Sequence, residues 1–298
     1  MGTSLVIGTS SWADPGFVEE WYPPGLPARD RLPYYAVRFE GVEVNSTFYA
    51  VPELRTVRRW AEVTPAHFSF DVKLHRLLSR HSGGVDSLPR ELRDGVETTA
   101  RGRVRLDRRL EDALLDATLA AIEPLAAAGK LSAFLLQLTP GFAPKTRELR
   151  ELEPIVERLA PHPVAIELRH RGWVEPERLE RTLGWFEEAG AAFVCVDGPP
   201  PGKPLTIMPP VDAVTHPELA YLRAHGRDAD AYVKGRSVAE RFAYRYGDGE
   251  LREIAQRVEA LAEQAGRVRV HFNNNRGDDA PVAAARFKEL LPAEERAT

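Results

Sequence analysis

The sequence predicts an α/β fold, a single (β/α)8 TIM barrel, on two observations. Short apolar runs alternate along the whole chain with amphipathic stretches of helical length, which is typical of parallel strands joined by helices. Eight such runs occur, and eight parallel strands with right-handed crossovers can close into a barrel. The 298 residues suit one barrel domain spanning 1–298. An open doubly wound sheet is the alternative, and it is disfavoured because none of the eight runs resembles an edge strand.

Each strand is expected where an apolar run lies between turn residues. The predicted strands are residues 5–9, 41–45, 68–73, 132–138, 164–169, 191–197, 220–225 and 268–273. Helices are expected where apolar residues recur at helical spacing, at residues 31–39, 53–63, 107–128, 145–159, from Pro176 onward, 250–265 and 280–290. Gly129 is placed to end the longest helix because glycine tolerates a positive φ, and Pro176 suits a first helical turn.

Two segments break this alternation. Residues 74–106 form a long insertion after the third strand, and a proline-rich, irregular loop at 198–217 takes the place of most of the sixth helix. The stretch that begins at Arg90 and ends at Arg109 holds seven arginines and four acidic residues. A solvated loop is the ordinary interpretation. A phosphate-binding lid or a nucleic-acid contact is the sharper hypothesis, and it predicts binding that weakens steeply with salt.

The composition is that of a soluble globular protein, with 43% hydrophobic and 28% charged residues. The net charge of −4 gives no global reason to expect nucleic acid or an anionic membrane as partner. No segment approaches the ~20 apolar residues of a membrane helix, so no membrane association is expected. One cysteine, Cys195, favours a reducing, cytoplasmic location, and its place in an apolar strand predicts an inert thiol.

Polar side chains stand at the carboxyl end of every predicted strand, where the active sites of barrels lie. In chain order the candidate site residues are Trp12, Glu43, Asn45, Thr47, Tyr49, Lys73, Gln137, Glu167, Arg169, Trp173, Asp197, Arg223, His225, Asn273 and Asn274. Any one of them could simply cap its strand. As a set they predict a charged, mutually neutralised pocket, because barrel interiors are usually filled with Val, Ile and Leu and buried charges persist only when paired.

The catalytic residues predicted from this set are Glu43, Lys73, Glu167 and His225. Glu43 and Glu167 could act as general acid and base if burial moves their pKa values toward neutrality. Lys73 could be an electrostatic clamp or a nucleophile, although a salt bridge to one of the two glutamates is the favoured interpretation. The remaining residues are expected to bind and orient a substrate, and Arg169 and Arg223 suit a phosphate or carboxylate group.

A divalent metal is the weaker alternative. Glu43, Glu167, Asp197 and His225 are ligand types that such ions accept, but no compact ligand spacing occurs and the neighbouring cations oppose metal binding. No cofactor is evident, because the chain has neither a GxxxxGK[ST] nor a strand-linked GxGxxG motif. A serine nucleophile is disfavoured by the absence of a GxSxG elbow.

Seven blocks of the chain resemble one known family. They are GTSSW (8–12), FEGVEVNSTFY (39–49), FSFDVK (68–73), LLQL (135–138), IELRHRGW (166–173), YLRAHG (221–226) and FNNNRGDDA (272–280). In this order they resemble the YecE-like family of uncharacterised TIM-barrel proteins. The resemblance implies a TIM barrel. It implies no catalytic residue, because the family's function is unknown.

Three functions are consistent with the sequence. The leading hypothesis is an enzyme of hydrolase, lyase or isomerase type that uses acid–base chemistry on a small polar, anionic or phosphorylated molecule. The first alternative is a barrel that processes or binds nucleic acid through the Arg90 to Arg109 stretch. The second is a non-catalytic ligand-binding barrel.

Overall fold

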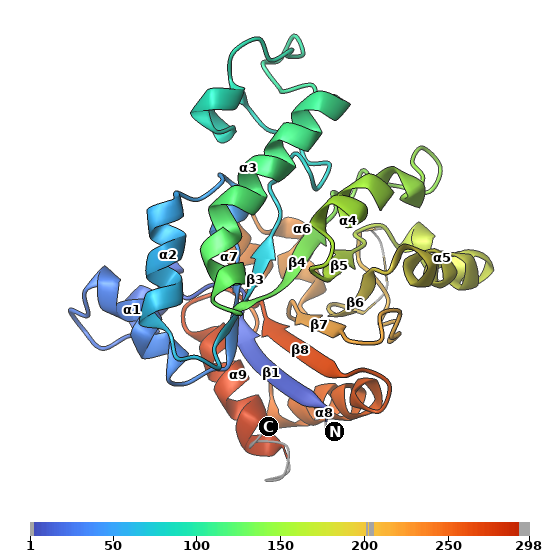
Figure 1. Ribbon diagram of the computed structural model, residues 1–298. Helices are drawn as coiled ribbons and strands as arrows, with labels where there is room; N and C mark the ends of the chain where they lie inside the picture. The colour runs from blue at the N-terminus through green and yellow to red at the C-terminus, as the bar shows by residue number, and fades with distance from the viewer. Residues whose placement is uncertain (1–2, 201, 203–205, 292–298) are drawn as a thin grey trace.

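Eight parallel strands surround a central axis, with helices on the outside, in the computed structural model, which describes residues 3–200, 202 and 206–291 (Figure 1). The strands are β1 (Ser4–Thr9), β2 (Gly41–Val44), β3 (Ser69–Lys73), β4 (Leu131–Gln137), β5 (Val164–Glu167), β6 (Ala192–Asp197), β7 (Ala220–Ala224) and β8 (Arg267–Phe272). Their order is β1-β8-β7-β6-β5-β4-β3-β2. The barrel prediction is confirmed, and the open sheet is wrong because the two ends of this order, β1 and β2, lie against each other.

The helices over the barrel are α1 (Ala28–Ala36), α2 (Leu54–Val63), α3 (Arg108–Ala127), α4 (Glu153–Leu159), α5 (Pro176–Ala189), α6 (Ala229–Lys234), α7 (Val238–Arg241), α8 (Asp248–Ala262) and α9 (Asp279–Leu290). The predicted helix at 145–159 begins later, as a 3-10 turn (Leu149–Leu152) that leads into α4. Neither α6 nor α7 was expected. In the predicted loop between β6 and β7, residues 198–200, 202 and 206–217 form no helix, and residues 201 and 203–205 lie outside the described residues.

The barrel has a seam between β1 and β2 that a tyrosine hydroxyl closes. The Tyr35 hydroxyl accepts a hydrogen bond from Thr9 N at 2.8 Å and lies 3.2 Å from the Gly41 carbonyl oxygen, to which it donates. A Cβ atom on Gly8 would lie 2.1 Å from that same oxygen, so the two strands approach too closely there for any side chain. The Tyr35 hydroxyl therefore links β1 and β2 in place of direct backbone hydrogen bonds between the two strands.

The barrel interior contains an apolar cluster beside its buried charged residues. Alternate residues of β4, β5 and β6, together with the start of β7, form a separate apolar cluster inside the barrel. Its members are Ala133, Leu135, Ala165, Ala192, Val194, Val196, Leu219 and Tyr221. On β2, β3 and β8 the corresponding positions hold buried Glu43, Asp71, Arg269 and His271. The larger hydrophobic core lies outside, between the strands and the helices.

The insertion after β3 projects from the barrel beside the start of α3 (Figure 1). It contains two 3-10 turns, Val85–Ser87 and Arg90–Leu92, and it closes on itself through antiparallel bridges between Gly84 and Arg103 and between Thr98 and Val104. Buried Leu88 and Val104 anchor it to the core. In the part of the chain that the structure describes, no helix has the length and apolar character needed to cross a membrane.

Candidate functional site

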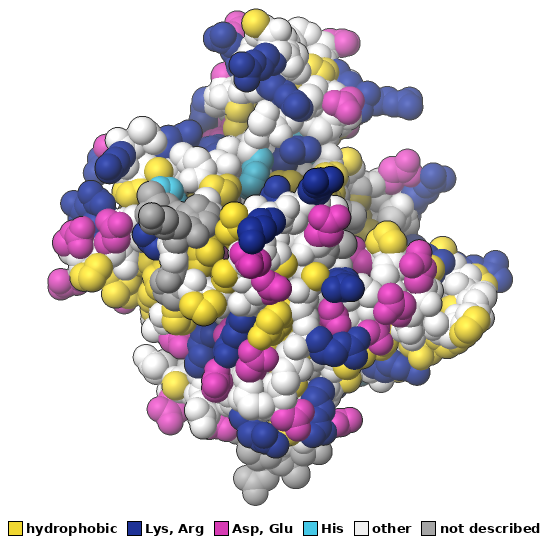
Figure 2. Space-filling view, turned by 180° about the vertical axis from the view of Figure 1, so that it is seen from behind, with side chains coloured by type: hydrophobic (Ala, Val, Ile, Leu, Met, Phe, Trp, Pro, Cys, Tyr) yellow, Lys and Arg dark blue, Asp and Glu magenta, His cyan; other side chains and the backbone are white. Residues whose placement is uncertain are grey.

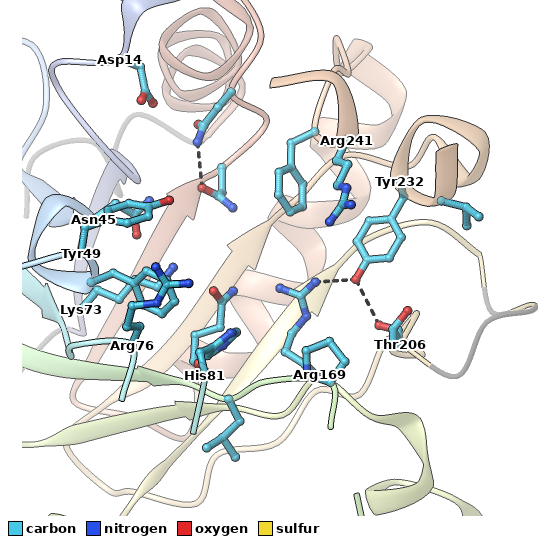
Figure 3. A pocket seen from close by; sticks show the side chains of 18 residues that line it. Asp14, Asn45, Tyr49, Lys73, Arg76, His81, Arg169, Thr206, Tyr232 and Arg241 are labelled. Carbon is cyan, nitrogen blue, oxygen red and sulfur yellow. Dashed lines mark hydrogen bonds between the residues drawn. The ribbon is translucent and has the colours of Figure 1, made fainter. Parts of the chain in front are cut away.

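A pocket of about 640 Å³ opens at the carboxyl ends of the strands. Six of the predicted site residues line it, namely Asn45, Tyr49, Lys73, Gln137, Arg169 and Asn273. Side chains from loops and from α6 and α7 complete the wall, and among them are Asp14, Arg76, His81, Thr206, Tyr232 and Arg241 (Figure 3). The prediction considered strand ends and therefore left these residues out as site candidates. One signal for such a residue was available in the sequence, the position of Arg76 three residues after the strand-end residue Lys73.

Four cationic side chains face this pocket from different elements. Lys73 ends β3, Arg76 follows it in the loop, Arg169 follows β5 and Arg241 ends α7. Figure 3 shows Lys73 and Arg76 on one side of the pocket and Arg241 on the other. Among the described lining residues, Asp14 provides the single carboxylate. The pocket wall is therefore strongly positive.

The Lys73 amine points into the pocket and has no carboxylate within 4.0 Å among the described residues. It lies 4.7 Å from the centre of the Phe48 ring. Burial lowers the pKa of Lys73 to about 7, the Arg223 guanidinium also lowers it, and Glu43 and Glu167 act in the opposite direction. The favoured salt bridge between Lys73 and a glutamate is therefore wrong, because both glutamates are bound to Arg223 instead.

Arg223 joins the two glutamates directly beneath the pocket. Its Nη2 and Nε atoms donate to Glu43 at 2.6 and 2.9 Å, and its Nη1 atom donates to Glu167. The Tyr221 hydroxyl donates to Glu43 at 3.1 Å. None of the three charged side chains is exposed to solvent. The predicted pairing of charges inside the barrel mouth is thus present, with Arg223 at its centre.

The two glutamates are held ionised. Burial alone would raise the pKa of Glu43, but Arg223, His271 and Lys73 outweigh that effect and the pKa lies below its usual value. Burial would also raise the pKa of Glu167, but its charged neighbours, of which Arg223 has the largest effect, hold that pKa well below its usual value. Neither carboxyl is poised to exchange a proton near neutral pH.

Glu167 is connected to the pocket wall through Gln137, Arg169 and, by way of His225, Asn273. Gln137 Nε2 donates to its Oε1 atom at 2.9 Å, and Arg169 Nη1 lies 3.3 Å away. Asn273 Nδ2 donates to His225 Nδ1 at 2.9 Å, so the proton of this ring lies on Nε2, which donates to Glu167 at 3.2 Å. Burial lowers the pKa of His225, and its imidazole is neutral and fully bonded.

Nine predicted site residues do not line the pocket; four of them, Glu43, Glu167, Arg223 and His225, form the cluster beneath it, and five lie elsewhere. Thr47 lies under Lys73, with its hydroxyl 2.6 Å from the Lys73 carbonyl oxygen. Trp12 packs edge-on against Trp60 and Trp173 stacks on Phe142, so both belong to the packing of the fold.

The other two, Asp197 and Asn274, turn toward surrounding loops and helices. Asp197 accepts hydrogen bonds from Arg227, Arg257 and Tyr246 on the outside of the barrel. Asn274 donates to the Tyr244 carbonyl oxygen at 2.8 Å. Both side chains therefore satisfy hydrogen-bonding groups of neighbouring segments, which is the structural alternative expected for any single strand-end residue.

A second buried ion cluster lies deeper in the barrel and was missed by the sequence reasoning. Asp71 accepts hydrogen bonds from Arg269 and from His271, the latter at 2.5 Å, and Arg269 donates to Ser69 at 2.9 Å. Arg223 pairs in register with His271 across β7 and β8, and Glu43 pairs in register with Asp71 across β2 and β3, so this cluster adjoins the Arg223 cluster. Asp71 lies two residues before Lys73, and His271 lies two residues before Asn273, so these side chains point to the same inward face of their strands. This spacing of two residues was the signal available in the sequence.

Histidines beside the pocket are neutral. His81 donates from Nε2 to the Gln137 carbonyl oxygen at 3.2 Å, and burial lowers its pKa to about 4. Over the described residues, no three His, Cys, Asp or Glu side chains converge in a way that could hold a metal ion. The polar wall thus combines cations, amides and one carboxyl group.

The sequence matches the family described as "Protein of unknown function DUF72" over residues 6–298. The chain belongs to the DUF72 family. This agrees with the YecE-like resemblance. A relative from Bacillus subtilis, "UPF0759 protein YunF", is 29% identical over 294 residues, which cover 97% of this chain and 95% of that protein.

Solved structures of DUF72 proteins share the fold. A DUF72 family protein from Thermotoga maritima superposes with a TM-score of 0.76 at 26% identity, covering 97% of this chain and 99% of the other. One from Enterococcus faecalis gives a TM-score of 0.75 at 26% identity, over 97% and 98% of the two chains. The barrel is therefore common to these DUF72 proteins, whose descriptions state no reaction.

Proposed function

We propose that this DUF72 protein is an enzyme that binds a small anionic molecule in the pocket and uses Lys73 to transfer a proton. The observation that carries the proposal is the set of cations around the pocket. Lys73, Arg76 and Arg241 have no carboxylate within 4.0 Å among the described residues, and Arg169 shares Glu167 with Arg223. Cations left unpaired around a cavity are what an anionic ligand would neutralise.

The division of roles follows from the electrostatics. Lys73, with a pKa of about 7, exists as both amine and ammonium at neutral pH, which suits a general base or acid. Glu43 and Glu167 hold Arg223 and, through it, set the field around Lys73. They are positioning residues in this proposal, whereas they were first expected to be acid and base.

Binding is tested by calorimetry and thermal shift with inorganic phosphate as the probe. We expect millimolar phosphate to raise the melting temperature of the natural protein. Arg76→Met should weaken phosphate binding about 10-fold, since a charge-assisted hydrogen bond contributes roughly 1.5–3 kcal/mol. Arg55→Met is the matched control, because Arg55 is exposed on α2 and paired with Glu53. Equal affinity in both variants contradicts the anion site.

The role of Lys73 is tested once a turned-over anion has been found by screening. Lys73→Arg keeps a positive charge but cannot lose a proton near pH 7. We expect this variant to bind phosphate and to lose turnover. Full turnover by Lys73→Arg would show that Lys73 is only an electrostatic clamp.

One observation favours a second candidate function, the binding of nucleic acid by the insertion. Figure 2 shows Lys and Arg side chains gathered on the segment that projects at the top. Four of its arginines, and Arg109 at the start of α3, are exposed and have no carboxylate within 4.0 Å among the described residues; the four are Arg90, Arg101, Arg103 and Arg105. Such a surface could contact phosphates without reading sequence.

Fluorescence polarisation with a labelled single-stranded RNA, at 50 and 200 mM salt, tests this second function. Replacing Arg101, Arg103 and Arg105 by Ser should reduce the slope of log affinity against log salt by about 2. Replacing the three exposed arginines of α2, Arg55, Arg58 and Arg59, is the control of equal charge. Loss of binding in both triple variants, or no RNA binding at all, removes this candidate.

A further inference from the structure

One wall of the pocket differs from the cationic walls. It is built from the segments that follow β1, β2 and β8, and it presents the Asp14 carboxyl together with the amides of Asn45, Asn273 and Asn275. Figure 3 places Asp14 and Asn45 apart from Arg169 and Arg241. The pocket therefore has a cationic part and a part rich in hydrogen-bond acceptors.

The Asp14 carboxyl has no partner of its own among the described residues. No ion pair or side-chain hydrogen bond reaches it, and its Oδ2 atom is buried and unbonded. Asn45 Oδ1 and Asn275 Oδ1 are also buried without a partner, although the amide nitrogens of both residues are bonded. A buried acceptor without a donor is costly, so this wall lacks a donor that a ligand could bring.

The wall is held in place by the backbone. The Asp14 carbonyl oxygen accepts a hydrogen bond from Val18 N at 3.1 Å, which fixes the start of the turn (Phe17–Trp21). A Cβ atom on Gly16 would lie 2.6 Å from the Gly277 carbonyl oxygen, so the loops after β1 and β8 are in direct backbone contact. Asp14 is thus positioned by the fold.

The chemistry of the missing donor is limited by the surrounding charges. An ammonium group or a metal ion on the ligand would be repelled by Lys73, Arg76, Arg169 and Arg241. A neutral hydroxyl group carries no such penalty and can donate to the carboxylate. The cavity of about 640 Å³ is also far larger than a phosphate ion, so the anionic group of a ligand would be only one part of it.

We infer that the ligand is a phosphorylated polyhydroxy compound, a sugar or polyol phosphate, whose phosphate lies among Arg76, Arg169 and Arg241 and whose hydroxyl groups donate to Asp14. This inference rests on the anion site proposed above. The permanently charged guanidinium groups match a dianionic phosphate monoester better than a singly charged carboxylate. The hydroxyl groups provide the donor that Asp14 lacks.

The test measures affinity by calorimetry at pH 7.5 with the full chain. The probes are inorganic phosphate, free ribose and a panel of sugar and polyol phosphates of three to six carbons, including glycerol 3-phosphate and ribose 5-phosphate. We expect at least one phosphorylated member to bind about 10-fold or more tightly than inorganic phosphate. Free ribose should show no measurable binding.

The variant Asp14→Ala separates this inference from the anion site. In this variant the sugar phosphate should bind no more tightly than inorganic phosphate. The affinity for inorganic phosphate itself should be unchanged or higher. Glu19→Ala, which removes an exposed carboxylate five residues along the chain and outside the pocket lining, should leave both affinities unchanged. Circular dichroism checks that both variants fold.

The remaining outcomes each overturn a stated part. If phosphate binds and depends on Arg76, but no sugar phosphate binds more tightly, this inference fails while the anion site stands. If phosphoethanolamine binds more tightly than glycerol 3-phosphate, the donor is an ammonium group and the hydroxyl assignment is wrong. If sugar acids bind more tightly than sugar phosphates, the phosphate assignment is wrong. If neither phosphate nor any panel member binds, the proposed function itself fails.

Discussion

The guanidinium group of Arg223 holds both carboxylate oxygens of Glu43, at 2.6 and 2.9 Å, in the interior of the barrel where neither side chain meets solvent. A buried pair of this kind is costly to break, because removal of one partner leaves the other charge uncompensated. The relationship therefore decides how variants of Glu43 should be interpreted.

Glu43→Gln should destabilise the protein by about 3–5 kcal/mol, because Arg223 would keep only Glu167 as a counter-charge. Urea denaturation measures the free energy of unfolding. Glu53→Gln, at an exposed position, should change it by less than about 0.5 kcal/mol. A Glu43→Gln protein as stable as the natural one would show that the pair does not carry this energy. Loss of turnover in this variant would not by itself identify a catalytic base.

Lys73→Met should make the protein more stable at neutral pH, by at least about 1 kcal/mol, while it abolishes turnover. The pKa of Lys73 falls from its ordinary value of 10.5 to about 7 in the folded protein, so the unfolded chain binds more protons between those pH values. The contribution of Lys73 to the free energy of unfolding is thus most unfavourable below pH 7 and vanishes as the pH rises toward 10.5.

Chemical denaturation of the natural protein and of Lys73→Met at pH 6, 8 and 10 checks this sign. The difference in the free energy of unfolding should be largest at pH 6 and smallest at pH 10. A difference that does not vary with pH, or a variant less stable than the natural protein at pH 6, would contradict the assignment of a depressed pKa to Lys73.

Tyr35→Phe should loosen the seam between β1 and β2. The Thr9 amide would lose its acceptor and the Gly41 carbonyl its donor, at a cost of about 1–3 kcal/mol. Hydrogen exchange should quicken at the Thr9 amide. Tyr34→Phe is the neighbouring control, since Tyr34 packs against Trp21 and Tyr22 and not in the seam. Unchanged protection at Thr9 in the Tyr35 variant would show that the hydroxyl does not close the barrel.

The Cys195 thiol should not react with iodoacetamide at pH 8 in the folded protein. Burial raises its pKa to about 12, and the side chain is fully enclosed. Mass spectrometry should find no alkylation until urea unfolds the chain, when one site per chain reacts. Alkylation within minutes under native conditions would contradict the inert interpretation of this residue.

The strands could be predicted from the sequence because each is an apolar run bounded by turn residues, and parallel strands buried on both faces keep that signal. The short helices α6 and α7 could not, since Gly235 and Ser237 interrupt the segment and leave no extended periodicity. Residues at 229–241 nonetheless supply Tyr232 and Arg241 to the pocket.

Several residues of the candidate site could be predicted from the sequence, but the ion pairs that they form could not. Strand position alone brings Asn45, Lys73, Gln137, Arg169 and Asn273 to one end of the barrel. Which cation meets which carboxylate depends on side-chain reach across the barrel, and for this reason Arg223 rather than Lys73 binds the glutamates. Loop residues such as Asp14 are positioned by contacts between distant segments, which the linear sequence does not reveal.

The apolar cluster inside the barrel has a consequence for the order of assembly. The members of this cluster come from residues 133–221 and carry no charge, so their contacts with one another require no ion pair. Glu43, Asp71 and Arg269 can leave water cheaply only when their partners from distant strands are already in place. Pulsed hydrogen exchange during refolding should therefore find β4 to β6 protected first, and the Tyr35 seam should be the last part of the wall to close.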